Sequence, residues 1–306
     1  MSRRRYLAAA AALAGLLAGG AVRASAAEPA VWRDAMGREV RLQVPAARIV
    51  SLAPSATETL FALGADWRIA GVSRHCDFPV AAKLKPRMGD FNQPDLPTVI
   101  AAAPDVVLFT EFARAADLAA LEAAGIAAFV LPARNVENVV ASVRSLGALT
   151  GETAAADRLA GGIEQAIGEI GGRLAGMSQA QRPLVYIEVD GPQQLYAVGP
   201  GSFMDDIVRL AGGRNVFSSR AEAYFPVDPG NVIAANPDVI LVDYPFQYKV
   251  GVSKRPGWDA VAAVRNARVY DGTDFDIIVF NRPGPRIAQA LREIAALLHP
   301  SLFPKR

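Results

Sequence analysis

The sequence has very few residues of the types that bind metals or form disulfide bonds. Cys76 is the single cysteine in 306 residues, and His75 and His299 are the two histidines. One cysteine cannot form an intrachain disulfide bond. These three residues also cannot provide the ligand sets of zinc fingers or metzincins. We find no P-loop, no nucleophile elbow and no convincing pair of a histidine and a carboxylate. The common signatures of phosphate-binding and hydrolytic enzymes are therefore missing.

Long apolar runs are also missing, except at the N-terminus. Residues 3–5 are arginines, residues 7–22 are mostly Ala, Leu and Gly, and Ala-Ser-Ala follows at 24–26. The apolar run is shorter than the roughly 20 residues that span a membrane. Residues 1–26 are therefore predicted to be a cleaved signal peptide. Its Ser-Arg-Arg start resembles a twin-arginine signal, and without a cysteine near the cleavage site lipid attachment is excluded. We expect a soluble protein of a Gram-negative periplasm.

The basic character of the whole chain comes from this N-terminal segment. Loss of residues 1–26 leaves 280 residues and removes four of the 32 basic residues, which changes the formal net charge from +2 to −2 against 30 acidic residues. The sequence pI of about 8.8 thus describes the precursor. The mature chain lacks the positive charge that favours nucleic-acid binding. Nucleic acid is therefore not an expected partner.

One ten-residue segment occurs twice. Residues 99–108 read VIAAAPDVVL and residues 232–241 read VIAANPDVIL, so that eight of ten positions are identical. Each copy predicts the end of a helix, a Pro-Asp turn and a buried strand. The spacing of 133 residues is too long for a solenoid repeat. The repeat indicates two similarly built lobes with a cleft between them.

Short strands and helices alternate in both halves, which favours βαβ units and parallel sheets. A hairpin is expected over 32–44, and Ser55 with Glu58 fits a capping box at the start of the first helix. Strands are predicted at 48–52, 69–73, 106–110, 129–131, 184–189 and 240–242, and helices at 55–63, 96–103, 115–124, 203–210 and 287–298.

A longer helix is predicted between the two halves. Leu159, Ile163, Ile167, Ile170 and Leu174 recur every three or four residues and form one apolar stripe. A helix over 153–177 would be about 37 Å long, because each residue adds about 1.5 Å. It would cross a whole domain. We expect a first lobe at 27–150, an interdomain helix within 151–180 and a second lobe at 181–306.

Three further motifs follow in order along the chain. They are SLAPSATETLFALGA at 51–65, GVSRHCDFP at 71–79 and NRPGPRI at 281–287. Together with the PDVVL strand and the long helix, they resemble the periplasmic substrate-binding proteins of iron-siderophore, haem and vitamin B12 importers. The resemblance covers about 30–303 and implies two α/β lobes with mainly parallel sheets, joined by a single long helix. GVSRHCDFP, RPGPRI and the later LLHPSLF are most similar to the cobalamin-binding members.

The resemblance implies that the ligand lies in the cleft, at the ends of strands. Aromatic planes would stack on a corrin or porphyrin, Arg282 would donate to its fringe oxygens, and neutral His75 would be a candidate axial ligand of cobalt or iron. The alternative for each aromatic residue is a place in the core. The implied ligand-binding residues are Pro54, Thr57, His75, Phe91, Phe109, Glu111, Tyr196, Phe225, Tyr244, Phe275 and Arg282.

The sequence leaves more than one function open. The leading hypothesis is a monomeric binding protein that takes a corrinoid to an inner-membrane ABC permease and its ATPase and has no resident cofactor. A haem or ferric-siderophore binder would have the same fold. The rival class is a metal- or tetrapyrrole-handling enzyme, for which Asp271, Asp274 and Asp276 are candidate bases or cation ligands. We expect these three residues to form a solvated loop instead.

Overall fold

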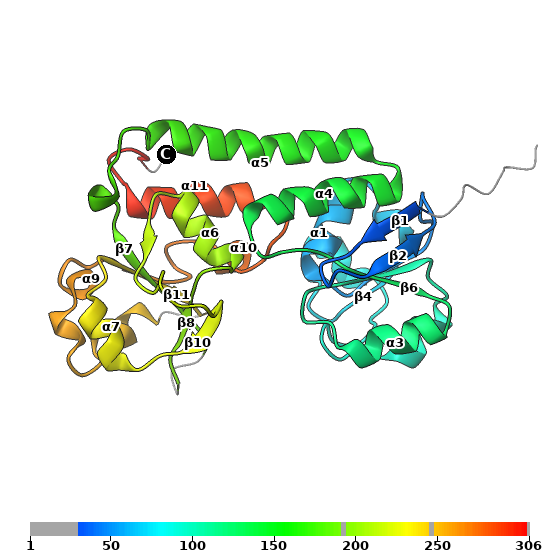
Figure 1. Ribbon diagram of the computed structural model, residues 1–306, viewed down its shortest axis with the longest axis horizontal. Coiled ribbons are helices and arrows are strands. Elements are labelled where there is room, and N and C mark those ends of the chain that lie inside the picture. The colour runs from blue at the N-terminus through cyan, green and yellow to red at the C-terminus, as the bar shows by residue number, and fades with distance from the viewer. Residues whose placement is uncertain (1–29, 191–193, 245–247, 305–306) are drawn as a thin grey trace, which may run out of the picture.

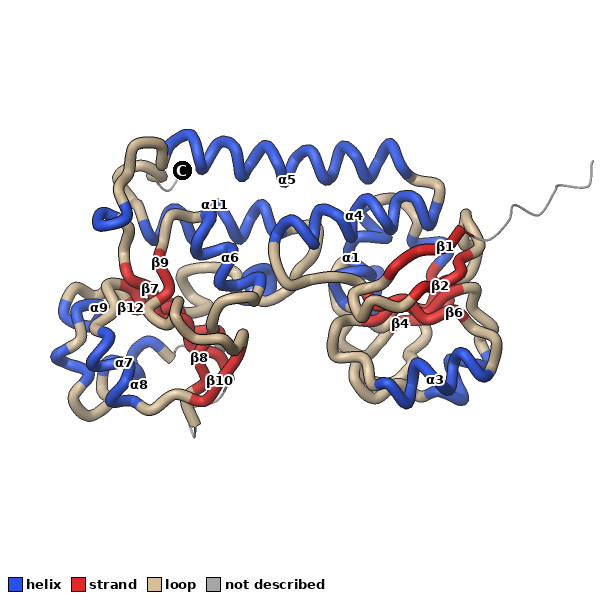
Figure 2. The backbone as a smooth tube through the Cα atoms, viewed as in Figure 1, coloured by secondary structure: helices blue, strands red, loops and turns tan. Residues whose placement is uncertain are grey.

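The computed structural model describes residues 30–190, 194–244 and 248–304. The predicted signal peptide lies outside the described residues. Two separate sheets lie side by side, and a layer of helices covers one side of both (Figures 1 and 2). The expected two-lobed α/β fold is therefore confirmed.

The first sheet is entirely parallel, with strand order β4-β3-β5-β6. An antiparallel hairpin of β1 and β2 precedes it, as the sequence predicted. The strands are β1 (Ala30–Arg33), β2 (Glu39–Leu42), β3 (Ile49–Ser51), β4 (Ile69–Val72), β5 (Val106–Phe109) and β6 (Ala127–Val130). The helices are α1 (Pro54–Ala62), α2 (Leu96–Ala101) and α3 (Ala115–Ala123), with 3-10 turns η1 (Asp66–Arg68) and η2 (Val80–Leu84).

The second sheet is mixed, with order β10-β8-β7-β11-β12 and β9 also paired with β7. Strands β8 and β10 are antiparallel to their neighbours, and the other pairs are parallel. The strands are β7 (Leu184–Val189), β8 (Tyr196–Val198), β9 (Arg214–Asn215), β10 (Tyr224–Pro226), β11 (Val239–Asp243) and β12 (Val269–Tyr270). The helices are α6 (Phe203–Leu210), α7 (Pro229–Ala235), α8 (Lys249–Ser253), α9 (Ala262–Arg265), α10 (Ile277–Phe280) and α11 (Ile287–Leu298), with η3 (Gln179–Gln181) and η4 (Trp258–Ala260).

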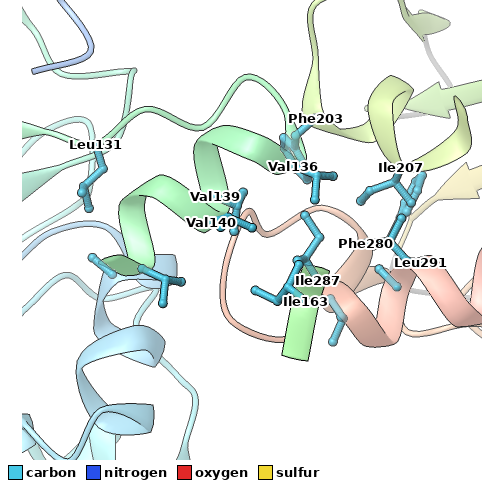
Figure 3. Close-up of a cluster of buried hydrophobic side chains, with 14 of the residues drawn as sticks. Leu131, Val136, Val139, Val140, Ile163, Phe203, Ile207, Phe280, Ile287 and Leu291 are labelled. Carbon is cyan, nitrogen blue, oxygen red and sulfur yellow. The ribbon is translucent and has the colours of Figure 1, made fainter. Parts of the chain in front are cut away.

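The predicted long helix is α5 (Thr153–Arg173), which runs over both halves (Figure 1). It packs on α4 (Val136–Thr150) and on α11. Side chains of α4, α5, α6 and α11 gather in one buried cluster, which includes Val140, Ile163 and Leu291 (Figure 3). Because this cluster continues into the cores of both halves, the helix layer holds the two sheets at a fixed separation.

The repeated segments form α2 with β5 and α7 with β11, and each strand is an inner strand of its sheet, with a parallel neighbour on both sides. Asp105 accepts backbone N–H bonds from residues 47 and 48 at 2.7 and 2.8 Å, and Asp238 accepts one from Leu184 at 2.8 Å. Each aspartate thus ties the start of its own strand to the start of a neighbouring strand. The repeat therefore reflects two similarly built helix-turn-strand units, each of which supplies an inner strand of its sheet.

Candidate functional site between the two lobes

A cavity of about 490 Å³ lies between the two halves of the protein. Its volume lies within the roughly 300–1,000 Å³ typical of small-molecule sites. Carbon atoms form most of its wall, with a few polar groups at strand ends. The first half contributes Pro54, Ser55, His75, Phe91, Phe109, Glu111, Leu131 and Val139, among others, and the second half contributes Val189, Phe203, Tyr224, Asp243, Asn281 and Arg282.

The structure brings six of the eleven residues singled out from the sequence to this cavity. They are Pro54, His75, Phe91, Phe109, Glu111 and Arg282. Phe109 is fully buried, so its ring belongs to the core of the first sheet and only borders the cavity. The remaining five do not line the cavity, and they are Thr57, Tyr196, Phe225, Tyr244 and Phe275.

Two of the five are core residues of a helix or loop. Thr57 is fully buried on the sheet side of α1, where its hydroxyl donates to Ser51 Oγ at 2.8 Å and lies 3.0 Å from Cys76 Sγ. Phe275 is buried edge-on against Phe280, with 5.4 Å between ring centroids. Neither position shows an alternation of polar and apolar residues from which its direction can be deduced.

Phe225 and Tyr244 each miss the cavity by one residue. Successive side chains of a strand point to opposite faces of the sheet. The neighbours Tyr224 and Asp243 therefore reach the cavity. Phe225 is buried on the other face against Phe217, with 5.5 Å between ring centroids.

The other two tyrosines are held by the second sheet. Buried Tyr244 donates its hydroxyl to the Val189 carbonyl at 3.3 Å. Tyr196, half-buried on β8, pairs with the cavity-lining Val189 and with Pro226 but does not itself line the cavity. The buried Tyr244 ring therefore helps to hold the sheet that carries the cavity wall.

The loop after β4 carries His75 and Phe91 to the cavity. His75 Nε2 lies 3.2 Å from Asp90 Oδ2, and the His75 and Phe91 rings meet edge-on at 5.2 Å. Gly89 has φ = +87°, and a Cβ there would lie 2.5 Å from the Asp95 nitrogen, so the turn requires glycine. Partial burial raises the pKa of Asp90, but hydrogen bonds from His75 and from the Phe91 N–H outweigh this effect, so the pKa is lowered overall. Asp90, which sequence analysis missed, fixes the orientation of His75.

Arg282 is bound by carboxylates of the first lobe. Its Nη1 donates to Glu58 Oε1 at 2.7 Å and to Asp77 Oδ1 at 2.8 Å. Arg286 Nε and Nη2 donate to the same Glu58 carboxylate at 2.8 and 2.7 Å. Glu58 therefore accepts from two arginines and forms no capping box, because α1 begins at Pro54 and has no side-chain cap. The predicted capping box is wrong.

The cavity wall also carries two carboxylates, Glu111 and Asp243. Both carboxylate oxygens of Asp243 lie 3.2 Å from Asn281 Nδ2, and burial raises the pKa of Asp243 to about 6. Burial raises the pKa of Tyr224 as well, and the negative charges of Glu111 and Asp243 raise it further. The Tyr224 phenol is therefore neutral and close to both carboxylates. Among the described residues that line the cavity, Arg282 has the only permanent positive charge, and it already binds two carboxylates.

The three aspartates that were candidate bases lie outside the cavity. Asp271 is buried and accepts N–H bonds from Lys249 and Thr273, and Asp274 pairs with Lys249 at 2.8 Å. Asp276 caps α10. The expected solvated loop is thus a hydrogen-bonded turn. In the part of the chain that the structure describes, no group of three His, Cys, Asp or Glu residues is arranged to hold a metal ion.

Comparison with known proteins identifies the family. The family model described as "Periplasmic binding protein" matches residues 49–274, which is more than half of the chain. The chain belongs to the periplasmic binding protein family. Family members and relatives are substrate-binding proteins of ABC transporters and not enzymes.

The relatives match this chain over most of their length. The uncharacterized ABC transporter substrate-binding lipoprotein YvrC of Bacillus subtilis is 29% identical over 279 residues, which are 90% of this chain and 87% of the relative. A cobalamin-binding protein of Halobacterium salinarum is 27% identical over 289 residues, or 89% and 74% of the two chains. The apo structure of the periplasmic haem-binding protein RhuT from Roseiflexus sp. RS-1 is 26% identical, with a TM-score of 0.72 over 83% of this chain and 98% of the other.

Over the described ranges, none of the helices combines the length and the apolar character needed to cross a bilayer. The protein is a binding protein of the ABC importer type.

Proposed function

We propose that this protein captures a cobalamin-like corrinoid in the cleft between its lobes and delivers it to an inner-membrane ABC permease. The observation that carries the proposal is the charge of the cavity wall. Glu111 and Asp243 offer carboxylate oxygens, and the nearest cation to Glu111 is the exposed Arg134, at 3.9 Å and outside the cavity lining. Arg282, the one permanent cation among the described lining residues, is bound by Glu58 and Asp77. Such a wall favours a ligand with a neutral fringe that carries N–H donors.

The fringe groups of the candidate ligands differ in charge. A corrinoid carries neutral carboxamides, whose N–H groups can donate to Glu111 and Asp243. A haem carries carboxylates, which would leave two negative groups facing each other in a partly desolvated cavity. Phe91, Leu131 and Phe203 offer apolar surface for the macrocycle. The cobalamin-binding relative from Halobacterium salinarum supports the same choice.

Haem is the second candidate ligand, and His75 is the observation that favours it. Asp90 lies against His75 Nε2, which leaves Nδ1 to coordinate a metal. Metal-binding histidines commonly donate their other ring N–H to a carboxylate. The haem-binding relative RhuT supports this alternative. If His75 is an axial ligand, His75→Ala should change the absorbance spectrum of the complex with the corrinoid or with haem. An unchanged spectrum would exclude that role.

A thermal-shift titration separates the candidates. The mature protein is titrated with cyanocobalamin, cobinamide, haem and a ferric siderophore. A ligand at one hundred times its Kd stabilises the folded state by about 2.7 kcal/mol, so a cognate corrinoid raises Tm as its concentration increases. A Tm that rises only with haem or only with the siderophore would reject the corrinoid proposal.

The cellular setting is part of the same proposal. Residues 1–26 are a cleaved signal peptide, and the mature protein is a periplasmic monomer that works with a permease and its ATPase. Mass spectrometry of the protein from a periplasmic fraction should give Ala27 as the first residue. Analytical ultracentrifugation should give the mass of one chain. A membrane-bound precursor or a stable dimer would contradict these parts of the proposal.

A further inference from the structure

Asp243 lies in a part of the cavity wall where few groups satisfy its charge. It ends strand β11, and among the described residues its two carboxylate oxygens share a single donor group, Asn281 Nδ2, at 3.2 Å each. An ionised carboxylate has about four acceptor positions. Within the described residues, no ion pair is formed by Asp243. The carboxylate therefore has acceptor capacity that is directed to the cavity.

The groups around Asp243 come from several elements, and none is a free cation. Tyr224 comes from β10, Asn281 follows α10, and Glu111 follows β5 in the other lobe. Arg282 is adjacent in sequence to Asn281 but binds Glu58 and Asp77. Among the described residues, the neighbours of Asp243 are thus two neutral hydrogen-bonding groups, Asn281 and Tyr224, and the charge of a further carboxylate, Glu111, acts on the same Tyr224.

Burial without a countercharge raises the pKa of Asp243 to about 6. The carboxylate is still mostly ionised near pH 8. A buried charge that lacks donors is costly, and a donor that completes its hydrogen bonds recovers part of that cost. A ligand N–H supplies such a donor, whereas a ligand carboxylate adds a second negative charge.

We propose that Asp243 is a specificity-determining residue, which selects ligands that present a neutral carboxamide to this wall over ligands that present a carboxylate. This inference rests on the proposed corrinoid function and deepens it. A purely structural role for Asp243, as an anchor for the Asn281 loop, would not distinguish two ligands that differ by one amide group.

The test compares ligands of nearly identical shape. Cyanocobalamin is compared with each of its monocarboxylic acids, in which one peripheral carboxamide has been hydrolysed. Isothermal titration calorimetry near pH 8 is performed on the wild type, on Asp243→Asn and on the matched control Asp259→Asn. Asp259 is exposed, lies in the same half of the chain and is outside the cavity.

Wild type should bind at least one monocarboxylic acid about 10- to 100-fold more weakly than cyanocobalamin, because a charge-assisted hydrogen bond is lost and a like charge is added. Asp243→Asn should reduce this preference to within about threefold, and Asp259→Asn should keep it. Circular dichroism and Tm establish that each variant is folded.

Two results overturn the inference, and they differ in what else they reject. If cyanocobalamin binds but the wild type shows no preference for the amide, or Asp243→Asn keeps the full preference, Asp243 does not determine specificity and the corrinoid function stands. If no corrinoid binds to the wild type, the proposed function is rejected together with this inference.

Discussion

Glu58 and Arg286 form a two-point ion pair between the first helix and the last. The Arg286 Nε and Nη2 atoms lie 2.8 and 2.7 Å from the two Glu58 oxygens, although 228 positions separate the residues. Arg282 adds a third bond to the same carboxylate, and the Arg286 guanidinium lies 3.8 Å from the centre of the Phe78 ring. This buried cluster joins the two lobes beside the cavity. Together with α5, it opposes changes in the angle between them.

Replacing Glu58 should therefore destabilise the fold strongly. Glu58→Ala removes the buried carboxylate that two partly buried arginines share, and leaves Arg282 with Asp77 at 2.8 Å and Arg286 with the more distant Asp276 at 3.9 Å. Breaking a buried ion pair typically costs about 3–5 kcal/mol, and the remaining partners reduce that cost. Urea unfolding monitored by circular dichroism gives the free energy of unfolding. Glu164→Ala is the matched control, since Glu164 pairs with Arg144 on the exposed surface of α5. Equal effects of the two substitutions would contradict a structural role for the Glu58 cluster.

Helix α5 and the Glu58 cluster also predict a small movement of the lobes when ligand binds. Because α5 and the Glu58 cluster both connect the lobes, we expect a largely preformed cleft instead of a wide hinge closure. Small-angle scattering should give nearly equal radii of gyration for the free and the liganded protein. A decrease of several ångströms in the radius of gyration on addition of ligand would show that α5 and the Glu58 cluster do not restrain the lobes.

Asp243 predicts a pH-dependent stability difference. In the folded protein burial raises its pKa to about 6 from the ordinary value of 3.8, so ionisation is harder in the folded than in the unfolded chain. This group therefore lowers stability as the pH rises from about 4 to about 6, and the penalty is constant above that range. Asp243→Asn removes the penalty. The Tm of the variant should exceed that of wild type near pH 8, and the difference should become small near pH 4 and vanish below the unfolded pKa.

The two faces of strand β10 predict opposite phenotypes for neighbouring residues. Phe225 is buried, so Phe225→Ala should cost about 3–5 kcal/mol of stability. Tyr224 has 38% of its surface exposed and lines the cavity, so Tyr224→Ala should change stability little. The same Tyr224→Ala variant should weaken cyanocobalamin binding by about tenfold, or about 1.4 kcal/mol. Urea unfolding and calorimetry measure the two effects, and loss of binding from Phe225→Ala alone would reverse the assignment.

Much of the architecture can be predicted from local patterns in the sequence. The apolar stripe through Ile163 and Ile170 predicts α5, although the helix ends at Arg173 and not at Met177. The repeated Pro-Asp segments predict two equivalent strands, because the turn and the apolar run are local features. The antiparallel strands β8 and β10 were not predicted, since strands of three residues carry too little periodicity.

The cavity wall was harder to predict, because it depends on register and on distant pairs. A shift of one residue along a strand changes the face to which a side chain points. The sequence predicts Phe225 and Tyr244 as ligand-binding residues, whereas their neighbours Tyr224 and Asp243 line the cavity. The role of Arg282 depends on Glu58, which is 224 residues away. No spacing rule connects two such residues before the fold is known.

The most direct test of the account is isothermal titration calorimetry of mature wild-type protein with cyanocobalamin and with haem, with Tyr224→Ala measured in parallel. The account predicts saturable binding of one cyanocobalamin per chain, weaker binding of haem and a loss of cyanocobalamin affinity in the variant. Tighter binding of haem, or cyanocobalamin binding that the cavity substitution leaves unchanged, would contradict it.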